Sequence, residues 1–440
     1  MTGTLIKAGQ VVCLDDRDHV YEPGYIVVEG ARIAEVGPQS ALSGRDFEKV
    51  VDLPQRLLMP GLVNAHTHSP MSLFRGRAEG HSLFNFEGWY NTIRVIEQVM
   101  TPDMLPPAVA LSCAEMIRTG TTCFADQYFW MDQIVPQVRR SGMRAALGYG
   151  IVELGEADAR AREIAAADSF LACVAGDELI SGWVGPHAFF VDNSIEAMQK
   201  ELALARKYGT GFHIHLSTSG EEDRYCRREF GSTAVQQMLQ MGMLEQPIIA
   251  AHCIDVPAED FATMARHPFT AVVAASSCMR NAAGAAPVPA MLEAGINVAM
   301  GTDNVTNNNS YDMFKEMQIT GKLFSFLERK PNAIATRTIL ELATMGGARA
   351  LGLEEEIGSL EPGKQADLIS LDLSEIGWAP AAQDVCTALV YGVSGMHVRD
   401  VLVAGRWLMR DGSLATINYA EERQRLEEAN DELDRRLREA

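Results

Sequence analysis

Residues 57–68 read LLMPGLVNAHTH, an apolar run that predicts a buried strand and ends in two histidines. Side chains two positions apart on a strand point to the same face, so His66 and His68 should lie side by side at the strand's end. The residues that follow, SPM, contain no Gly-rich phosphate loop, which an open doubly wound sheet would carry after its first strand. The stretch therefore favours a closed parallel barrel.

The same pattern of apolar strand and amphipathic helix recurs along the chain. Residues 103–120 and 194–209 are typical helices of this kind, with apolar side chains at i, i+3, i+4 spacing and a final Gly. Eight such repeats predict an α/β fold of the (β/α)₈ TIM-barrel class. The predicted strands are Leu57–Val63, Thr121–Ala125, Met143–Tyr149, Gly182–Gly185, Gly211–Leu216, Pro247–Ala251, Phe269–Ala274 and Asn297–Met300.

The two ends of the chain differ in texture from its middle. Short β-branched runs broken by Gly, Asp and Arg dominate residues 1–56, and similar runs return after residue 360. We therefore predict a small β-sandwich domain made of residues 1–56 and 361–440, with the catalytic barrel of residues 57–360 inserted between the two parts. Residues 420–440 predict a charged helix on the surface or at a subunit contact.

Composition limits the class of partner. The 440 residues are 47% hydrophobic, and 38 Lys and Arg against 58 Asp and Glu leave a net charge of −20. Nucleic acid and anionic membranes repel such a surface, so neither is expected as a partner. We see no signal-peptide pattern and no apolar window that would span a bilayer. With eight scattered Cys and no C-x-x-C pair, the chain is predicted to be cytoplasmic with reduced thiols.

Metal-binding side chains gather where the predicted strands end. Active sites of (β/α)₈ barrels lie at the C-terminal ends of the strands. A carboxylate after an apolar strand is costly unless it is paired or metal-bound. Imidazole and carboxylate together suit Zn²⁺, with Fe²⁺ or Mn²⁺ as alternatives. The residues at these ends are His66, His68, His213, His215, His252 and Asp303.

A divalent metal at this point would lower the pKa of its water to about 7 and deliver hydroxide. Asp303 can bind the metal and accept the water proton, and His252 can hold the water or the developing oxyanion. Aromatic residues gather in the predicted loops and suit a flat heteroaromatic ligand. They are Phe84, Phe86, Trp89, Tyr90, Tyr128, Phe129, Trp130, Phe189 and Phe190.

Eight motifs cover nearly the whole chain: PGLVNAHTH (60–68), RTGTTCFAD (118–126), GPHA (185–188), HIHLS (213–217), AAHCI (250–254), GAAPVPAML (284–292), GTDN (301–304) and GSLEPGKQADL (358–368). In combination they resemble the amidohydrolase superfamily. The branch they are most similar to is that of the methylthioadenosine/S-adenosylhomocysteine deaminases and the triazine (atrazine) chlorohydrolases.

The resemblance implies one divalent metal ion per subunit and hydrolytic removal of a leaving group from an electron-poor N-heterocycle. The metal ligands it implies are His66, His68, His215 and Asp303. His252 matches the family's water or substrate partner. The resemblance also implies a small heterocyclic substrate and a homodimer or homotetramer.

Substrate contacts follow from the same resemblance. His187 of GPHA matches a substrate-binding histidine, and Trp89 belongs to the aromatic cluster already named. Glu97 matches a substrate-binding glutamate with shifted spacing, and a solvated helix face is the alternative for this residue. Asn304 follows the aspartate of GTDN, as in the triazine chlorohydrolases.

The chain departs from the family's pattern at positions that bear on the reaction. Thr218 stands at the catalytic position where the family carries a proton-shuttling Glu. Glu221 or Glu222 of the same loop could substitute for it, but we favour their interpretation as surface charges. Tyr149 stands where the deaminases carry an arginine that binds a substrate carboxylate. The family's HNP-x-SN motif is replaced by AASSCMRN at residues 274–281.

The favoured hypothesis is a metal-dependent hydrolase that deaminates a purine-, pterin-, pyrimidine- or triazine-like ring. Dechlorination of such a ring is the second choice, because a better leaving group needs less acid catalysis than ammonia. Hydrolysis of a cyclic amide, urea or carbamate is a further alternative, motivated by Thr218. A catalytically inactive scaffold protein is the alternative from a different class.

Overall fold

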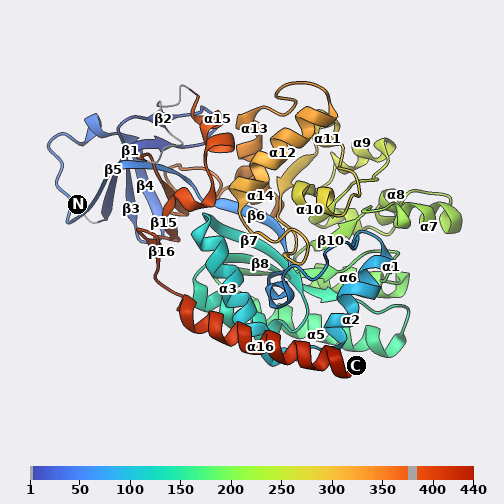
Figure 1. Cartoon of the computed structure of the whole chain (residues 1–440). Coiled ribbons are helices and arrows are strands. Elements are labelled where there is room, and N and C mark those ends of the chain that lie inside the picture. The colour runs from blue at the N-terminus through green and yellow to red at the C-terminus, as the bar shows by residue number, and fades with distance from the viewer. Residues whose placement is uncertain (1–2, 375–383) are drawn as a thin grey trace.

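The chain ends and the middle of the chain, which differ in sequence pattern, form two separate β-sheets that lie beside each other in Figure 1. The computed structural model describes residues 3–374 and 384–440. The sheet at the left of Figure 1 combines strands from both ends of the chain, as predicted, in the order β17-β16-β15-β14-β5-β1-β3-β4, with β2 paired to β1. Its strands are β1 Thr4–Val12, β2 Val20–Tyr21, β3 Gly24–Glu29, β4 Arg32–Pro38, β5 Lys49–Pro60, β14 Leu368–Asp372, β15 Val398–Val403, β16 Arg406–Arg410 and β17 Ser413–Leu414.

The second sheet is an eight-stranded parallel barrel, which confirms the predicted fold class. The strands follow one another in chain order from β6 to β13. Four of them, β6, β7, β11 and β12, are buried throughout and the others are mostly buried, because the two faces of a barrel strand meet the barrel interior and the outer helices. The strands are β6 Leu62–Thr67, β7 Thr121–Tyr128, β8 Arg144–Ile151, β9 Ile180–Pro186, β10 Phe212–Leu216, β11 Ile248–His252, β12 Phe269–Val273 and β13 Asn297–Met300.

The prediction of the first barrel strand was wrong for the first half of that strand. Leu57 to Pro60 belong to β5 and pair with β1 and β14 in the other sheet. The chain crosses between the sheets at Gly61, where an added Cβ would lie 2.1 Å from the Thr122 hydroxyl. Only glycine lets the backbone pass so close to β7, and the barrel therefore begins at Leu62.

The barrel closes between β13 and β6 through contacts at the ends of these strands. The backbone N–H of Asp303 donates to the carbonyl of His66 at 2.9 Å. Asn64 and Thr302 exchange two hydrogen bonds, side chain to side chain at 2.8 Å and backbone N–H to amide oxygen at 3.0 Å. A Cβ at Gly301 would lie 2.8 Å from the backbone nitrogen of His66. The closure thus brings the eighth strand directly against the first.

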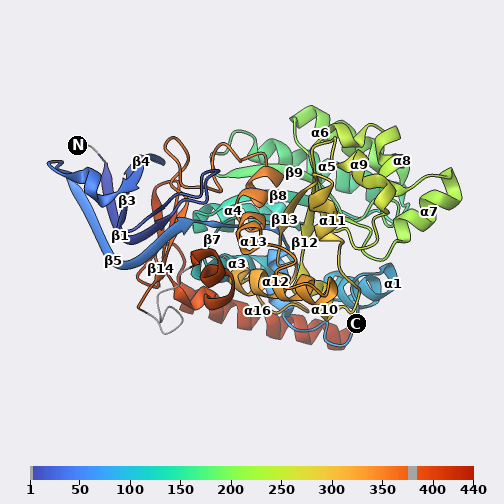
Figure 2. The ribbon, with the colours of Figure 1, turned by 90° about the horizontal axis from the view of Figure 1, so that it is seen from above.

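Helices surround the barrel, as the view from above in Figure 2 shows. At the N-terminal ends of the strands, Ala348 and Ala350 of α14 pack with Ala and Val side chains of the barrel interior. The helices are α1 Phe86–Trp89, α2 Val95–Val99, α3 Leu105–Arg118, α4 Met131–Ser141, α5 Ala157–Val174, α6 Ile195–Tyr208, α7 Glu221–Phe230, α8 Ala234–Gln240, α9 Phe261–Met264, α10 Ala275–Arg280, α11 Val288–Glu293, α12 Met313–Leu327, α13 Thr336–Leu342, α14 Met345–Ala350, α15 Val385–Thr387 and α16 Tyr419–Glu439.

The charged C-terminal segment forms α16, the long helix that runs beneath the barrel in Figure 1 and packs along α3. Arg77 and Asp434 form an ion pair, and the Asn430 amide donates to the carbonyl of Leu73, so the helix holds the segment that follows β6. None of the helices among the described residues is long and apolar enough to cross a membrane.

Candidate metal centre and substrate cavity

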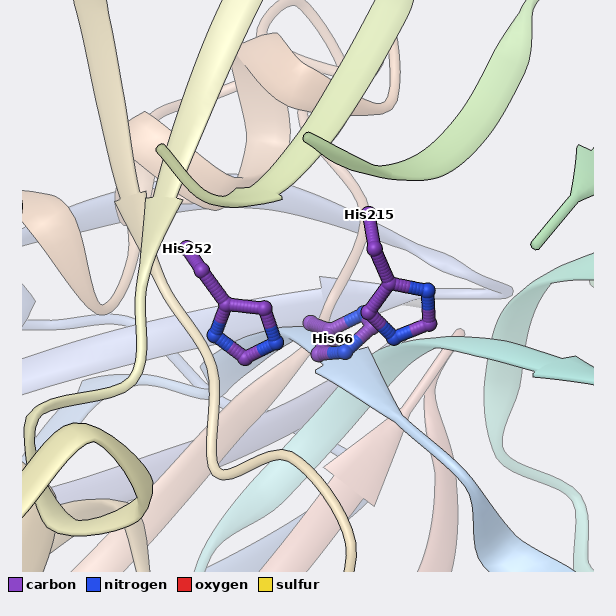
Figure 3. Close-up of side chains that lie close together, drawn as sticks. All are labelled: His66, His215 and His252. Carbon is purple, nitrogen blue, oxygen red and sulfur yellow. The ribbon is translucent and has the colours of Figure 1, made fainter. Parts of the chain in front are cut away.

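Four strand ends bring four histidines and one aspartate together at the barrel mouth. Figure 3 shows the rings of His66, His215 and His252 pointing toward a common space. Ligand atoms of these three rings lie within 4.8 Å of one another, and so do those of His66, His68 and Asp303. The Oδ1 atom of Asp303 lies 3.5 Å from the Nε2 atoms of both His66 and His68. The structure therefore brings together all the residues that the strand-end pattern singled out, except His213.

Backbone carbonyls decide which nitrogen of two imidazoles faces this space. His68 Nδ1 donates to the carbonyl of Gln127 at 2.8 Å, and His215 Nδ1 donates to that of His187 at 2.9 Å. A neutral ring protonated at Nδ1 has a lone pair at Nε2. The two Nε2 atoms lie 3.2 Å apart. Two lone pairs this close repel each other, and a cation bound to both removes the repulsion.

Burial keeps these imidazoles neutral. Burial and the neighbouring His66 lower the pKa of His68 to about 3, and burial lowers the pKa of His215 well below its usual value. In the described part of the chain, the buried Nε2 of His66 has no hydrogen-bond partner. Neutral nitrogen donors beside a carboxylate are the ligand set that Zn²⁺ favours. The residues present thus fit a divalent metal ion.

Asp303 stands on a constrained backbone just beyond β13. Its φ of 60° lies in the left-handed region, which costs a residue other than glycine. Oδ1 accepts from the backbone and side-chain N–H groups of Asn304 at 2.6 and 2.9 Å, and the Ser277 hydroxyl donates to Oδ2. These contacts fix the carboxylate in its charged form.

Two residues that sequence reasoning left without a role support the HxH strand. His213 lies below the cluster, with its Nε2 atom 2.8 Å from Nδ1 of His66. Asp126 accepts from the Thr67 hydroxyl at 2.7 Å and from the Ser69 backbone at 2.6 Å. Asp126 ends the RTGTTCFAD motif, and the pairing of β7 with β6 places it beside the loop after His68. Only this pairing reveals its role.

A cavity of about 910 Å³, its open mouth included, lies above the cluster. One wall is the segment between β6 and α2, which is held by two backbone contacts. Leu83 N–H donates to the Asn281 amide oxygen at 2.6 Å, and Phe86 N–H donates to Glu221 at 3.1 Å. The predicted aromatic lining is present in part, through Phe84, Phe86, Trp89, Tyr128 and Phe129.

His187 lines the cavity next to this wall. Its ring stacks on Trp89 with 4.3 Å between centroids, and its Nδ1 atom lies 2.5 Å from the Asp192 carboxylate. Burial opposes a charge on the ring, but Asp192 raises the pKa of His187 above its usual value. Asp192 also accepts from the Ala188 backbone at 3.1 Å. Sequence reasoning missed Asp192, whose position five residues after His187 carries no recognisable signal.

Glu97 and Tyr149 differ in their relation to the main cavity. Glu97 lines the cavity, is only 7% exposed and lies 3.3 Å from Arg94, which excludes a solvated helix face. Burial raises its pKa, although Arg94 counters this. Tyr149 lines an adjoining cavity, which Glu97 also lines, and its hydroxyl donates to Glu163 at 3.0 Å. Arg94 is the one Lys or Arg that lines the main cavity among the described residues.

The acidic residues that follow β10 do not lie where we predicted. Thr218 and Asn304 both line the cavity. The interpretation of Glu222 as a surface charge was wrong: its side chain lines the same cavity and is 1% exposed. Glu221 also lines the cavity and is partly buried. The chain turns sharply at Ser217, with a φ of 48°, and this turn brings α7 back over the strand ends.

The molecule is a (β/α)₈ barrel in which neutral imidazoles and a carboxylate face one space at the mouth. This arrangement is typical of the class of metal-dependent hydrolases. The chain belongs to the amidohydrolase family, whose model matches residues 57–408. It is 33% identical to a 5'-deoxyadenosine deaminase of Methanosarcina barkeri, over 99% of this chain and 100% of the relative. It is 34% identical to a 5-methylthioadenosine/S-adenosylhomocysteine deaminase of Caldanaerobacter subterraneus subsp. tengcongensis, over 94% of each chain.

Solved structures agree with this assignment. The chain is similar to an adenosine deaminase from Xanthomonas campestris with bound zinc, at 30% identity, a TM-score of 0.92 and 99% coverage of both chains. It shares its fold with the atrazine chlorohydrolase TrzN from Arthrobacter aurescens TC1 complexed with zinc, at 20% identity and a TM-score of 0.88, over 97% of this chain and all of that one. The predicted resemblance to the amidohydrolase family and its adenosine-derivative deaminases is thereby confirmed, and the likeness to the chlorohydrolase shows a shared fold.

Proposed function

We propose that the protein is a zinc-dependent aminohydrolase that replaces the amino group of an adenine-like ring by oxygen and releases ammonia. One observation carries the proposal: at the barrel mouth, the unprotonated Nε2 atoms of His68 and His215 face each other at 3.2 Å beside Asp303. We infer one Zn²⁺ per subunit, with Fe²⁺ or Mn²⁺ as alternatives, held by His66, His68, His215 and Asp303.

The chain's own residues would divide the work around this metal. A divalent cation, when bound, lowers the pKa of a coordinated water and so supplies a nucleophile at neutral pH. Asp303 is placed to accept a proton from the attacking water, because Ser277 and Asn304 hold both of its oxygens in position. His252 Nε2 lies 4.0 Å from Oδ2 of Asp303, where it can hold the water or the developing oxyanion.

The cavity suits a flat heterocycle whose substituent is uncharged, with or without hydroxyl groups. Aromatic side chains cover the ring site, and the stacked pair of Trp89 and His187 provides one planar surface. Glu97 is placed to accept hydrogen bonds from substrate hydroxyls. The named relatives act on adenosine derivatives, and Tyr149 stands where the resemblance expects an arginine for a substrate carboxylate. We therefore place neutral adenosine derivatives ahead of S-adenosylhomocysteine.

The test measures metal content and ammonia release on the same protein. Purified enzyme is expected to bind one zinc ion per chain and to release ammonia from an adenosine derivative while the purine ring stays intact. Chelation is expected to remove both metal and activity, and added Zn²⁺ to restore them. A metal-free enzyme with full activity, or no ammonia from any aminoheterocycle, would contradict the proposal.

Dechlorination is the second candidate, and one observation favours it: the loop after β10 carries Thr218 where the resemblance expects a glutamate. Chloride release from a chlorinated triazine or purine, measured beside ammonia release, separates the two reactions. Ring opening with an acid product would instead support hydrolysis of a cyclic amide, urea or carbamate.

We further infer a cytoplasmic homo-oligomer, a dimer or tetramer. All eight cysteines, each in the described part of the chain, are free thiols, which suits a reducing compartment. Light scattering of the purified protein tests the oligomeric state.

A further inference from the structure

Expelling ammonia from a ring carbon requires an acid as well as a nucleophile, because the ring nitrogen gains a proton when water adds. Five carboxyl groups line the cavity, and four of them are engaged elsewhere. Glu97 lies against Arg94, and Asp192 against His187. The other two engaged groups are Glu221, which accepts from the Phe86 backbone, and Asp303, which belongs to the metal cluster.

The fifth group, Glu222, is held close to the strand end that carries His215. Its Oε1 atom accepts from the backbone N–H of Ser217 at 2.9 Å. Its neighbour Asp223 accepts from the Ser217 hydroxyl at 3.0 Å, so two residues of α7 hold this turn. Glu222 Oε2 is buried and has no hydrogen-bond partner among residues 3–374 and 384–440. One oxygen thus positions the carboxyl group and the other stays available.

The surroundings of Glu222 favour its protonated form near neutral pH. Burial, reinforced by Asp223 and Glu221 on the same helix, raises its pKa to about 7, although its own N–H and that of Ser217 oppose the shift. Two thiols are further titratable neighbours, Cys226 on the same helix and Cys253 after β11, and burial raises the pKa of both above the usual value. A group with a pKa near the working pH is suited to acid–base catalysis.

We propose that Glu222 is the general acid of this enzyme and does from α7 what a glutamate at position 218 would otherwise do. The inference rests on the proposed aminohydrolase function. As water adds to the ring carbon, Asp303 takes one water proton, and the C=N electron pair moves to the ring nitrogen, which takes the Glu222 proton.

The second half of the reaction restores both carboxyl groups. Asp303 passes its proton to the amino group, and the C–N bond breaks with its electron pair leaving on ammonia. The hydroxyl proton returns to Glu222 as the new C=O bond forms. The balance is ring–NH₂ plus water to the ring lactam plus ammonia, with no other reactant.

The experiment compares Glu222→Gln with the wild-type enzyme on an amino substrate and on its chloro analogue of the same ring. With zinc content unchanged, kcat for ammonia release should fall by about 10²–10⁴-fold, and chloride release, which needs less acid help, by a smaller factor. Wild-type kcat should decline as the pH rises through about 7, where Glu222 loses its proton. This decline should be absent in Glu222→Gln and retained in Glu222→Asp.

Glu229→Gln, an exposed position on the same helix, is the matched control and should behave as wild type. Ammonia release by Glu222→Gln within about twofold of wild type would overturn the role of Glu222 alone. Equal losses on both substrates with the pH decline intact would overturn it in favour of a structural role. Failure of the wild-type enzyme to release ammonia from any aminoheterocycle would overturn the proposed function and this inference with it.

Discussion

The two ends of the barrel differ in whether their buried ionisable groups have partners. At the N-terminal ends of the strands, Arg144 of β8 and Asp367, which precedes β14, form a buried bidentate ion pair at 2.9 and 3.2 Å. Asp367 also accepts from the backbone of Ala404 at 2.7 Å. This end of the barrel joins the two sheets, and the buried charges of Arg144 and Asp367 are paired there.

At the mouth, several ionisable atoms are buried without a hydrogen-bond partner among the described residues, and three residues there have a strained backbone. In the described part of the chain, Nε2 of His66, Nδ1 of His252 and Oε2 of Glu222 have no hydrogen-bond partner. Ser217, His252 and Asp303 have φ values of 48°, 76° and 60°. Strain and unpaired polar groups persist only where the surrounding structure enforces them. The contrast indicates that one end of the barrel stabilises the fold and the other provides chemistry.

The largest expected effect is the loss of activity in Asp303→Ala. Removing this carboxylate takes away a proposed metal ligand and the proposed proton acceptor, so zinc content and kcat/KM should both collapse, the latter by at least about 10³-fold. Metal analysis and ammonia assays check this, with Asp431→Ala on the exposed face of α16 as control. Sustained turnover by Asp303→Ala without bound metal would contradict the assignment of the barrel mouth as the metal-dependent active site.

At the opposite end, Asp367→Ala should affect stability rather than chemistry. The substitution leaves the Arg144 guanidinium buried and unpaired, which costs about 3–5 kcal/mol in the free energy of unfolding. Urea denaturation should show this loss, whereas zinc content per folded chain should stay unchanged. Glu245→Ala, which breaks the exposed pair with Arg206, should cost less than about 1 kcal/mol. Equal costs for the two substitutions would remove the contrast between the ends.

Glu201 of α6 offers a test by pH. Both of its buried oxygens lack a hydrogen-bond partner within the residues that the structure describes, and burial, with Asp192 and Glu153 nearby, raises its pKa well above the usual value. The folded state therefore keeps a proton that the unfolded state releases above about pH 4.3, so stability is lost as the pH rises.

Glu201→Gln removes this titration. The variant should match wild type near pH 4 and exceed it by roughly 1–3 kcal/mol at about pH 8, as measured by urea denaturation at both values. Glu196→Gln, an exposed position on the same helix, should show no such pH-dependent gain. A constant difference at both pH values would show that Glu201 is not buried as a neutral acid.

The smallest expected effect concerns the cavity wall. Trp89→Ala removes one of the two stacked rings that we place against the substrate. A ring-to-ring contact with the substrate is worth about 1 kcal/mol, so KM should rise roughly fivefold to tenfold with kcat nearly unchanged. Trp89→Phe should retain most of the affinity. A loss confined to kcat would mean that Trp89 acts on the reaction rather than on binding.

Much of the candidate metal site was predictable because strand periodicity places alternate residues on one face and parallel strands end at one edge. This rule selects His66, His68, His215 and His252 but also His213, and Asp303 lies just beyond its strand. The resemblance to the amidohydrolases was needed to separate the implied ligands from His213. The cavity wall was predictable only in part, because its residues belong to helices and loops whose arrangement no local pattern specifies. Glu222 is the clearest case, since three acidic residues at a helix start are usually solvated, and the sharp turn at Ser217 buries this one.

The sequence by itself determined the barrel, the terminal sheet built from both ends, and the side chains at the mouth, because these depend on periodicities of two and 3.6 residues. Only the tertiary structure decided which nitrogen of His68 and His215 faces the metal space, since carbonyls of other strands fix their Nδ1 protons. It also decided that Glu222 and Glu97 are buried and that Tyr149 lines the adjoining cavity. Burial and hydrogen bonding are properties of neighbours far apart in the chain, and no single stretch of sequence contains them.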